Sequence, residues 1–208
     1  MNTQQQPEQK VFMGSHDENI LVVKRSDLFP QEAFQGLKTV EDASWLETIL
    51  SKKEFLPRSL METDPTYKQI IPYLVFMHDN KLFLMQRQAK ASETRLQSKY
   101  SLGIGGHIRE EDIQDADIVS WARREFHEEV IYNDDFTVEP LGILNDDSND
   151  VGKVHVGFVY LLRGSSANIT VQEELKSGTL LTIEECAAFY DRMETWSQIV
   201  FNALKQTI

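Results

Sequence analysis

Three glutamates, Glu125, Glu128 and Glu129, recur at a spacing that places them along one edge of an α-helix. Like charges at this spacing destabilise a helix by about 0.2–0.5 kcal/mol for each exposed pair, so three of them need a compensating cation. Clustered carboxylate oxygens are the ligands that Mg²⁺ or Mn²⁺ prefers. A solvated acidic helix face would give the same spacing in so acidic a protein, and the surrounding residues decide between the two interpretations.

The helix that carries these glutamates is predicted from about Asp115 to Ile131. Apolar residues recur along it at helical spacing, as they do where a helix packs on a core. These residues are Ile118, Val119, Ala122, Phe126 and Val130.

A double glycine and an arginine add to the pattern. Gly105-Gly106 precedes the helix, and the helix contains Arg124-Glu125-Phe126-x-Glu128-Glu129. Together they resemble the Nudix box, the strand-loop-helix signature of enzymes that hydrolyse nucleoside diphosphates linked to another moiety. The resemblance covers about Gln69 to Ile208 and, more narrowly, suggests bacterial stand-alone Nudix proteins with an N-terminal extension.

The resemblance implies roles for the residues of this motif. Glu125, Glu128 and Glu129 match the metal ligands of the family, and one of them also orients or deprotonates the attacking water. Arg124 matches the arginine that pairs with a box carboxylate and organises the loop. The expected catalytic set is therefore these four residues, with Mg²⁺ or Mn²⁺ as the cofactor.

The loop before the helix departs from the family pattern. Seventeen residues separate Gly106 from Arg124, four more than the family has. Counting forward from Gly106 places the first acid of the box at Asp112, and counting back from Arg124 places it at Ala116. Glu110 and Glu111 are close by, so the acid stays unassigned. The closing glycine of the family is Ile131 here, which predicts a helix end without a left-handed cap.

Residues around the motif are candidates for contact with the substrate. Gly105 and Gly106 would let the backbone pass close to a metal and a pyrophosphate. His107 would contact phosphate or water, or would be a loop histidine bonded to backbone. Arg87 and Arg95 could neutralise substrate phosphates, although a solvated surface charge explains each of them alone.

Acidic residues after the box offer one more candidate ligand. Glu174, beside Glu173, stands where many family members place an additional metal-binding carboxylate; a solvated loop is the alternative. His155 lies in a predicted strand and is interpreted as a structural histidine with satisfied hydrogen bonds. Cys186 has no cationic neighbour that would activate it and is expected to be a buried thiol.

The order of the elements predicts an α/β fold, a Nudix-type α/β/α sandwich with a mixed sheet and a small N-terminal α/β extension. Predicted strands cover 69–77, 81–86, 101–104, 136–144, 153–162 and 179–182, and predicted helices begin near Thr182 and Trp196. His78-Asp79-Asn80 reads as a hairpin turn, and Thr182-Ile-Glu-Glu185 as a capping box.

The chain is expected to divide into three parts. Residues 1–10 form a polar, glutamine-rich tail, residues 11–66 an α/β extension packed on the main domain, and residues 67–208 the Nudix domain. Asp64-Pro65 lies at the second boundary because a residue before proline disfavours helix.

Composition excludes several classes of protein. The 208 residues are 41% hydrophobic and 26% charged, as in a globular chain. The net charge of −12 argues against stable binding to nucleic acid or to an anionic membrane. No apolar run approaches the ~20 residues of a membrane span, and no secretory signal is evident. A single cysteine fits a reducing, cytoplasmic compartment, and a homodimer is compatible with this composition.

The leading hypothesis is a Mg²⁺-dependent hydrolase that cleaves a pyrophosphate bond in a nucleoside diphosphate-linked or nucleotide-like substrate. A nucleotide-binding regulator with little turnover is the alternative, favoured by the displaced acid and by Ile131. An isomerase of isoprenoid diphosphates would need an active-site cysteine, and Cys186 lies far from the box.

Overall fold

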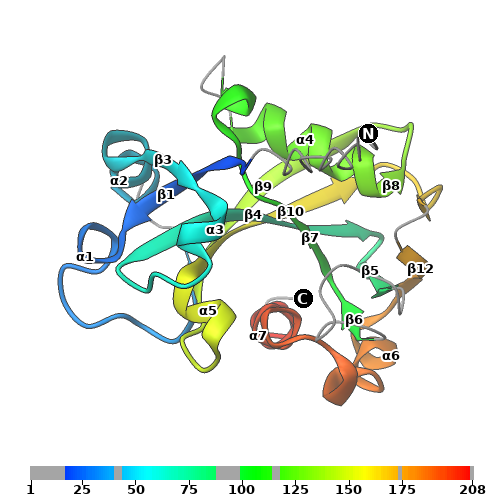
Figure 1. The fold of residues 1–208 in the computed structure, drawn as a ribbon. Coiled ribbons are helices and arrows are strands. Elements are labelled where there is room, and N and C mark those ends of the chain that lie inside the picture. The colour runs from blue at the N-terminus through cyan, green and yellow to red at the C-terminus, as the bar shows by residue number, and fades with distance from the viewer. Residues whose placement is uncertain (1–16, 40–43, 88–98, 114–117, 173–174, 207–208) are drawn as a thin grey trace, which may run out of the picture.

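A mixed β-sheet with helices on both faces organises the protein in the computed structural model, which describes residues 17–39, 44–87, 99–113, 118–172 and 175–206 (Figure 1). The strands are β1 (Asn19–Lys24), β2 (Gly36–Thr39), β3 (Glu54–Pro57), β4 (Tyr67–His78), β5 (Lys81–Arg87), β6 (Tyr100–Ser101), β7 (Gly103–Gly105), β8 (Val130–Ile131), β9 (Phe136–Asn145), β10 (His155–Gly164), β11 (Thr170–Val171) and β12 (Leu175–Leu181). The helices are α1 (Arg25–Leu28), α2 (Ser44–Lys52), α3 (Arg58–Met61), α4 (Ile118–Glu129), α5 (Asp150–Val154), α6 (Ile183–Ala187) and α7 (Thr195–Leu204), with 3₁₀ turns at Glu110–Ile113 and Tyr190–Arg192.

Strand β4 is the centre of the main sheet, whose order is β12-β5-β4-β10-β9-β2. One edge of β4 runs parallel to β10 over nine residue pairs. Its other edge is shared, in succession, by β1, β7 and β5, all antiparallel. Strand β4 is buried on both faces, which accounts for its nearly continuous run of apolar residues.

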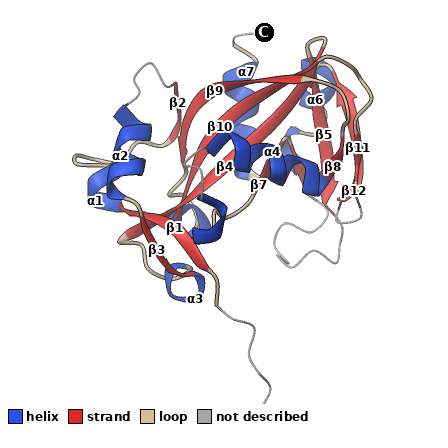
Figure 2. Cartoon of the chain, turned by 90° about the horizontal axis from the view of Figure 1, so that it is seen from above, coloured by secondary structure: helices blue, strands red, loops and turns tan. Residues whose placement is uncertain are grey.

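Alternate side chains of β4 enter two separate cores. Leu74 and Phe76 pack in the core that includes Phe126 of α4. Tyr73 and Val75 pack in the core that includes Phe201 of α7. Figures 1 and 2 show the result, with α4 over one face of the sheet and α6 and α7 over the other. The predicted α/β sandwich with a mixed sheet is confirmed.

The N-terminal part, defined here as Asn19–Met61, is hydrogen-bonded into this sheet. Strand β1 pairs with β3 and with the beginning of β4, and β2 pairs with β9. The backbone N–H of Leu21 also donates to the carbonyl of Ile108 at 2.7 Å, in the loop that follows β7. The N-terminal part therefore contacts the same loop that leads toward α4.

A partly buried ion-pair network lies between β4 and the turn after β9. Lys68, which is fully buried, donates to Asp147 at 2.8 Å and to the Gly152 carbonyl at 2.6 Å. Arg25 donates to the same carboxylate. Hydrogen bonds from Arg25 and Lys68 outweigh the effect of burial and hold the pKa of Asp147 well below its usual range. This network joins the N-terminal part to β4 and β9.

Several predicted elements are confirmed and three boundaries are wrong, one of them at the strand predicted from Thr179, which begins at Leu175. Asp79 and Asn80 have positive φ, as the predicted hairpin requires, and the Thr182 capping box is present. The predicted helix to Ile131 ends at Glu129 instead, because the β-branched Val130 and Ile131 pair with β11. The strand predicted from Lys153 begins at His155, after the short helix α5.

Helix α5 was not predicted from the sequence, because its five residues are too few to show a helical period. Asn149 caps it by accepting a hydrogen bond from the backbone of Gly152 at 3.0 Å. The predicted tail, residues 1–10, lies outside the described residues. Within the described ranges, every helix is too short or too polar to traverse a lipid bilayer.

Candidate active and metal site

Helix α4 presents the three glutamates beside a buried apolar face. Phe126 and Val130 of the predicted face are buried. Glu125 and Glu129 are half-buried, whereas the Glu128 side chain is mostly exposed. The packing of the helix thus fixes the first and third carboxylates more firmly than the second.

The environment of Glu125 disfavours its ionised form. Burial raises its pKa to about 7, and repulsion from Glu128 and Glu129 adds to the effect, while Arg124 opposes it. The positive charge of Arg124 is therefore insufficient to balance the three carboxylates. A bound cation would supply the missing charge.

The double glycine brings the backbone against this cluster. A Cβ atom on Gly106 would lie 2.0 Å from Oε1 of Glu125, so only glycine leaves the carboxylate where it is. A Cβ on Gly105 would contact the Ile71 side chain at 3.0 Å and the Pro72 carbonyl at 3.2 Å. Both close approaches are to groups of the protein, and the expected approach of this backbone to a metal and a pyrophosphate stays a prediction.

Asp112, one of the loop acids that the sequence left open, lies against Arg124 and Trp121. Its carboxylate accepts a hydrogen bond from Arg124 Nη2 at 2.7 Å and one from Trp121 Nε1 at 3.1 Å. Hydrogen bonds from Arg109 and Arg124 outweigh the burial of Asp112 and lower its pKa. Glu111 is exposed and lies 3.6 Å from Arg109. Among the described acids of the loop, Asp112 is thus the partner of Arg124.

Trp121 has a role that the sequence alone did not determine. The ring is buried and its N–H donates to Asp112, so the indole packs in the core and orients the carboxylate. A tryptophan nine residues after the acid carries no local signal for such a contact. The contact between Trp121 and Asp112 forms only in the folded protein, where the loop lies against α4.

His107 lies beside Gln69 and His155, away from the three glutamates of α4. Its Nε2 is 2.7 Å from Gln69 Oε1 and 3.3 Å from Nε2 of His155. Burial lowers its pKa to about 3, with Arg58 and His155 adding to the shift. His155 is buried, and its Nδ1 is 2.8 Å from the Val151 carbonyl.

The other predicted contacts are described only in part. Arg87 lies in β5 with its backbone paired to Leu175, and its side chain is outside the described residues. Arg95, Glu173 and Glu174 are also outside them. Cys186 is buried, and burial raises the pKa of its thiol to about 11, which keeps it protonated.

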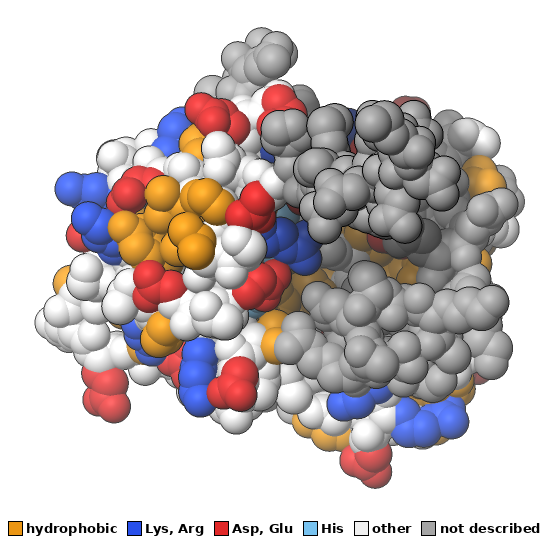
Figure 3. Space-filling model, in the orientation of Figure 1, with side chains coloured by type: hydrophobic (Ala, Val, Ile, Leu, Met, Phe, Trp, Pro, Cys, Tyr) orange, Lys and Arg blue, Asp and Glu red, His pale blue; other side chains and the backbone are white. Residues whose placement is uncertain are grey.

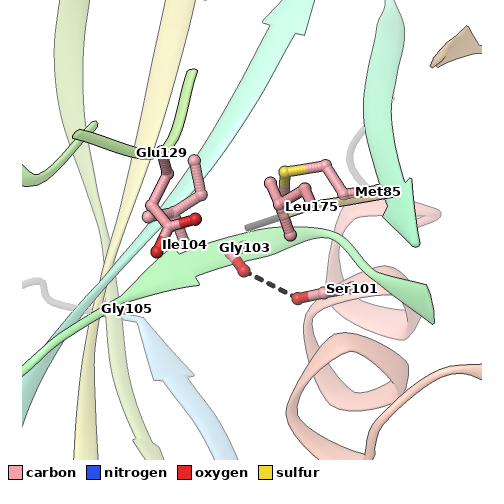
Figure 4. Close-up of a pocket in the computed structure, with 7 residues that line it drawn as sticks. All are labelled: Met85, Ser101, Gly103, Ile104, Gly105, Glu129 and Leu175. Atoms are coloured by element: carbon pink, nitrogen blue, oxygen red, sulfur yellow. Dashed lines mark hydrogen bonds between the residues drawn. The ribbon is translucent and has the colours of Figure 1, made fainter. Parts of the chain in front are cut away.

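A small hollow lies beside Glu129. Figure 4 shows the Glu129 carboxylate above β7, with Met85 and Leu175 on the other side of the hollow. The hollow is lined by Met85, Ser101, Gly103, Ile104, Gly105, Glu129 and Leu175. Ser101 Oγ donates to the Gly103 carbonyl at 2.6 Å and so fixes the bend between β6 and β7. One carboxylate thus borders a mainly apolar recess.

Charged side chains are mixed over the surface near this region. On the face drawn in Figure 3, the described Lys and Arg side chains lie among Asp and Glu side chains. This arrangement differs from the basic stripe that is typical of proteins that follow a nucleic-acid backbone.

Comparisons with known proteins give close and distant relatives. The chain matches no protein-family model. It is 36% identical over 207 residues to Protein YmaB of Bacillus subtilis (strain 168), covering 93% of this chain and 100% of that protein. Among solved structures it resembles Tm1382, assigned as a Nudix hydrolase, with 32% identity, a TM-score of 0.75, and coverage of 92% of this chain and 100% of that one.

A more distant structure shares the fold alone. The NUDIX domain of Shewanella oneidensis NrtR, solved with ADP ribose, has a TM-score of 0.54 and 15% identity. The match covers 67% of this chain and 88% of that domain.

Proposed function

Because the chain belongs to the Nudix superfamily, we propose that it hydrolyses a pyrophosphate bond in a nucleoside diphosphate-linked or nucleotide-like substrate, with Mg²⁺ or Mn²⁺ as cofactor. The observation that carries the proposal is the environment of Glu125 beside Gly106, where burial, with repulsion from Glu128 and Glu129 added to it, raises the pKa of Glu125 to about 7. Such a cluster is suited to a hard divalent cation, whose charge relieves the repulsion.

The donor set fits Mg²⁺ or Mn²⁺. All three side chains offer carboxylate oxygens, which suit these ions better than they suit zinc or copper. Glu125, Glu128 and Glu129 would hold the cation, and Glu174 is a further candidate ligand. When bound, the metal polarises phosphoryl oxygens and lowers the pKa of an attacking water.

The protein's own groups have separate tasks in this proposal. Arg124, fixed by Asp112, holds the loop against α4 and keeps the glutamates in register. Gly105 and Gly106 are proposed to let the backbone pass close to the metal and the pyrophosphate. Glu129, which borders the small hollow over β7, is proposed as one of the carboxylates that face the substrate.

Substrate phosphates need positive groups besides the metal. Arg87 and Arg95 are the proposed contacts, since both precede the box and carry full charge at neutral pH. His107 is half-buried and its pKa is lowered to about 3, so hydrogen bonding rather than charge would be its contribution.

Two observations favoured the regulator alternative, the displaced acid and Ile131, and only the second still stands. The pairing of Asp112 with Arg124 supports the proposal that Asp112 serves as the displaced acid. Ile131 still replaces the closing glycine, but it lies in β8 and leaves α4 to end without distortion.

The test is hydrolysis of a panel of compounds with Mg²⁺. The panel contains nucleoside triphosphates, dinucleoside polyphosphates, nucleotide sugars, ADP-ribose and NADH, with ADP-ribose first because the NrtR domain binds it. Glu129→Gln should lower metal-dependent turnover by orders of magnitude while circular dichroism stays unchanged, because the amide keeps the size and removes the charge.

A matched control isolates the metal cluster from charge in general. Glu139 is a partly exposed glutamate paired with Arg163 at 2.9 Å, and Glu139→Gln should leave turnover unchanged. If folded Glu129→Gln turns over as fast as the parent protein, the cluster does not perform the reaction. If no panel member is hydrolysed yet one binds tightly, the regulator alternative takes precedence.

A further inference from the structure

A second group of metal-ligand atoms lies where the N-terminal part meets β4 and β10. One ring nitrogen each of His107 and His155 and a carboxylate oxygen of Glu62 all lie within 4.8 Å of one another. Glu62 follows α3, His107 follows the double glycine, and His155 begins β10. Three segments distant in the sequence thus converge on one point.

The two histidines approach each other through the same kind of atom. Their Nε2 atoms are 3.3 Å apart. Two imidazole nitrogens bound at about 2.0–2.1 Å to one tetrahedral Zn²⁺ would lie about 3.3–3.4 Å apart. The observed separation therefore already equals that of a pair of zinc ligands.

Hydrogen bonds orient His155 and the amide of Gln69. His155 Nδ1 lies 2.8 Å from the Val151 carbonyl, which assigns its proton to Nδ1 and a lone pair to Nε2. The Gln69 amide N–H donates to the Met61 carbonyl, so Gln69 directs its oxygen at His107. The Gln69 oxygen and Nε2 of His155 thus both face Nε2 of His107.

A bond from the remote nitrogen of a histidine to a carbonyl is also the arrangement that orients histidine ligands in metal sites. His155 has this bond, and its backbone is fixed further because Lys68 donates to its carbonyl at 3.2 Å. The His155 imidazole is therefore positioned by the fold before any metal arrives.

We propose that Glu62, His107 and His155 form a second cation site that binds a transition-metal ion, Zn²⁺ in preference to Mg²⁺. Two imidazoles and one carboxylate are a zinc ligand set, whereas Mg²⁺ selects oxygen ligands. Gln69 Oε1 is the nearest fourth donor. Coordination of His107 through Nε2 moves its ring proton to Nδ1, so no change of net charge is required.

Arg58 is the group that opposes a cation at this site. Its Nε donates to Glu62 at 3.1 Å, so it competes for the carboxylate as well as repelling the metal. Arg58 also lies 3.9 Å from Glu18, which offers the guanidinium another partner when Glu62 turns toward the histidines. Both side chains of the Arg58–Glu62 pair are 39% exposed and free to make this exchange.

The consequence of the site is a link between two parts of the fold. Glu62 belongs to the segment before β4, and His107 is adjacent to Gly106, which contacts Glu125. A zinc ion here would restrain the loop at the glutamate cluster without taking a ligand from it. The inference does not depend on the proposed hydrolase activity.

The experiment measures Zn²⁺ binding to metal-free protein by calorimetry, in excess Mg²⁺ to occupy the glutamate cluster. The parent protein should bind one Zn²⁺, and Co²⁺ in its place should give the visible absorption of a tetrahedral site with nitrogen ligands. Glu62→Gln should weaken binding at least tenfold, and Arg58→Gln should strengthen it, because a competitor for Glu62 is removed.

Two controls make the result specific. Glu54→Gln removes a carboxylate with the same 39% exposure from β3, and should bind Zn²⁺ as the parent does. Glu129→Gln should also retain zinc, which separates this site from the glutamate cluster. No zinc binding by the parent, equal binding by Glu62→Gln and Glu54→Gln, or loss of zinc only in Glu129→Gln would each overturn the proposal.

Discussion

Arg124 and Asp112 join the helix of the glutamate cluster to the loop before it, with Arg124 Nη2 2.7 Å from Asp112 Oδ1. The carboxylate is 1% exposed, although the guanidinium remains partly exposed. A buried carboxylate of this kind is stable only while its donors stay in place, so loop and helix are fixed together.

Asp112→Asn should therefore reduce turnover at least tenfold, about 1.4 kcal/mol of transition-state stabilisation, by loosening the loop against α4. Unfolding should become easier by about 1–3 kcal/mol, since Arg124 and Trp121 lose a charged acceptor. Steady-state hydrolysis and chemical denaturation measure the two effects. Glu111→Gln, at an exposed neighbour, is the control, and an equal loss of turnover in it would contradict this assignment.

Gly106→Ala should impair metal binding more than folding. The new Cβ meets only the flexible end of Glu125, which can rotate away but then leaves the cluster. We expect the free energy of unfolding to change by less than about 1 kcal/mol and Mg²⁺ affinity to fall at least tenfold.

Gly103→Ala gives the opposite pattern. Its Cβ would lie 2.2 Å from the buried ring of Tyr73, and such overpacking costs about 1–3 kcal/mol. Denaturation and Mg²⁺ titration of the two variants separate the effects. Intact metal affinity in folded Gly106→Ala would show that Glu125 is not a ligand.

Mg²⁺ or Mn²⁺ should stabilise the metal-free protein by mass action on the native state. The expected gain is ~2.7 kcal/mol at a hundredfold excess over the dissociation constant, and EDTA should reverse it. Thermal denaturation followed by circular dichroism measures the shift. A variant with Glu125, Glu128 and Glu129 all changed to Gln should show none, and an unchanged midpoint in the parent counts against a metal site formed without substrate.

Asp147→Asn should destabilise the protein by about 2–3 kcal/mol, the low end for breaking a buried pair because Asp147 and Arg25 are partly exposed. Asp150→Asn, which removes an exposed pair with Lys153, is the matched control and should leave stability unchanged.

The lowered pKa of Asp147 also predicts how the free energy of unfolding responds to acid. Because the pKa of Asp147 is lowered in the folded protein, its contribution is complete above the unfolded value of about 3.9 and is lost as pH falls below it. Denaturation between pH 7 and pH 3 should show a steeper loss below pH 4 in the parent than in Asp147→Asn. Equal slopes would contradict this account.

The sequence predicted the helix of the glutamate cluster because three charged positions and an apolar face share one period. It could not choose Asp112 over Glu110, Glu111 or Ala116, because counting along the chain fails where residues are inserted. In the folded protein Asp112 contacts Arg124, a pairing that the spacing in the sequence leaves open.

Contacts between distant segments were the other limit of sequence reasoning. His107, Glu62 and His155 belong to three separate segments, so no spacing in the sequence brings them together. The end of α4 was placed too late for a related reason. Val130 and Ile131 fit a helix locally but find strand partners in β11, which is far along the chain.

Strand β1 has a consequence for any shortened form of this protein. It covers the Tyr67–Gln69 stretch of β4, and it shares a hydrogen bond with Ile108. A chain that began at Tyr67 would present those N–H and C=O groups, with buried Lys68 and Gln69 beside them, as a bare strand edge. Such an edge is a template on which a second copy adds its own strand, so the shortened chain is expected to aggregate.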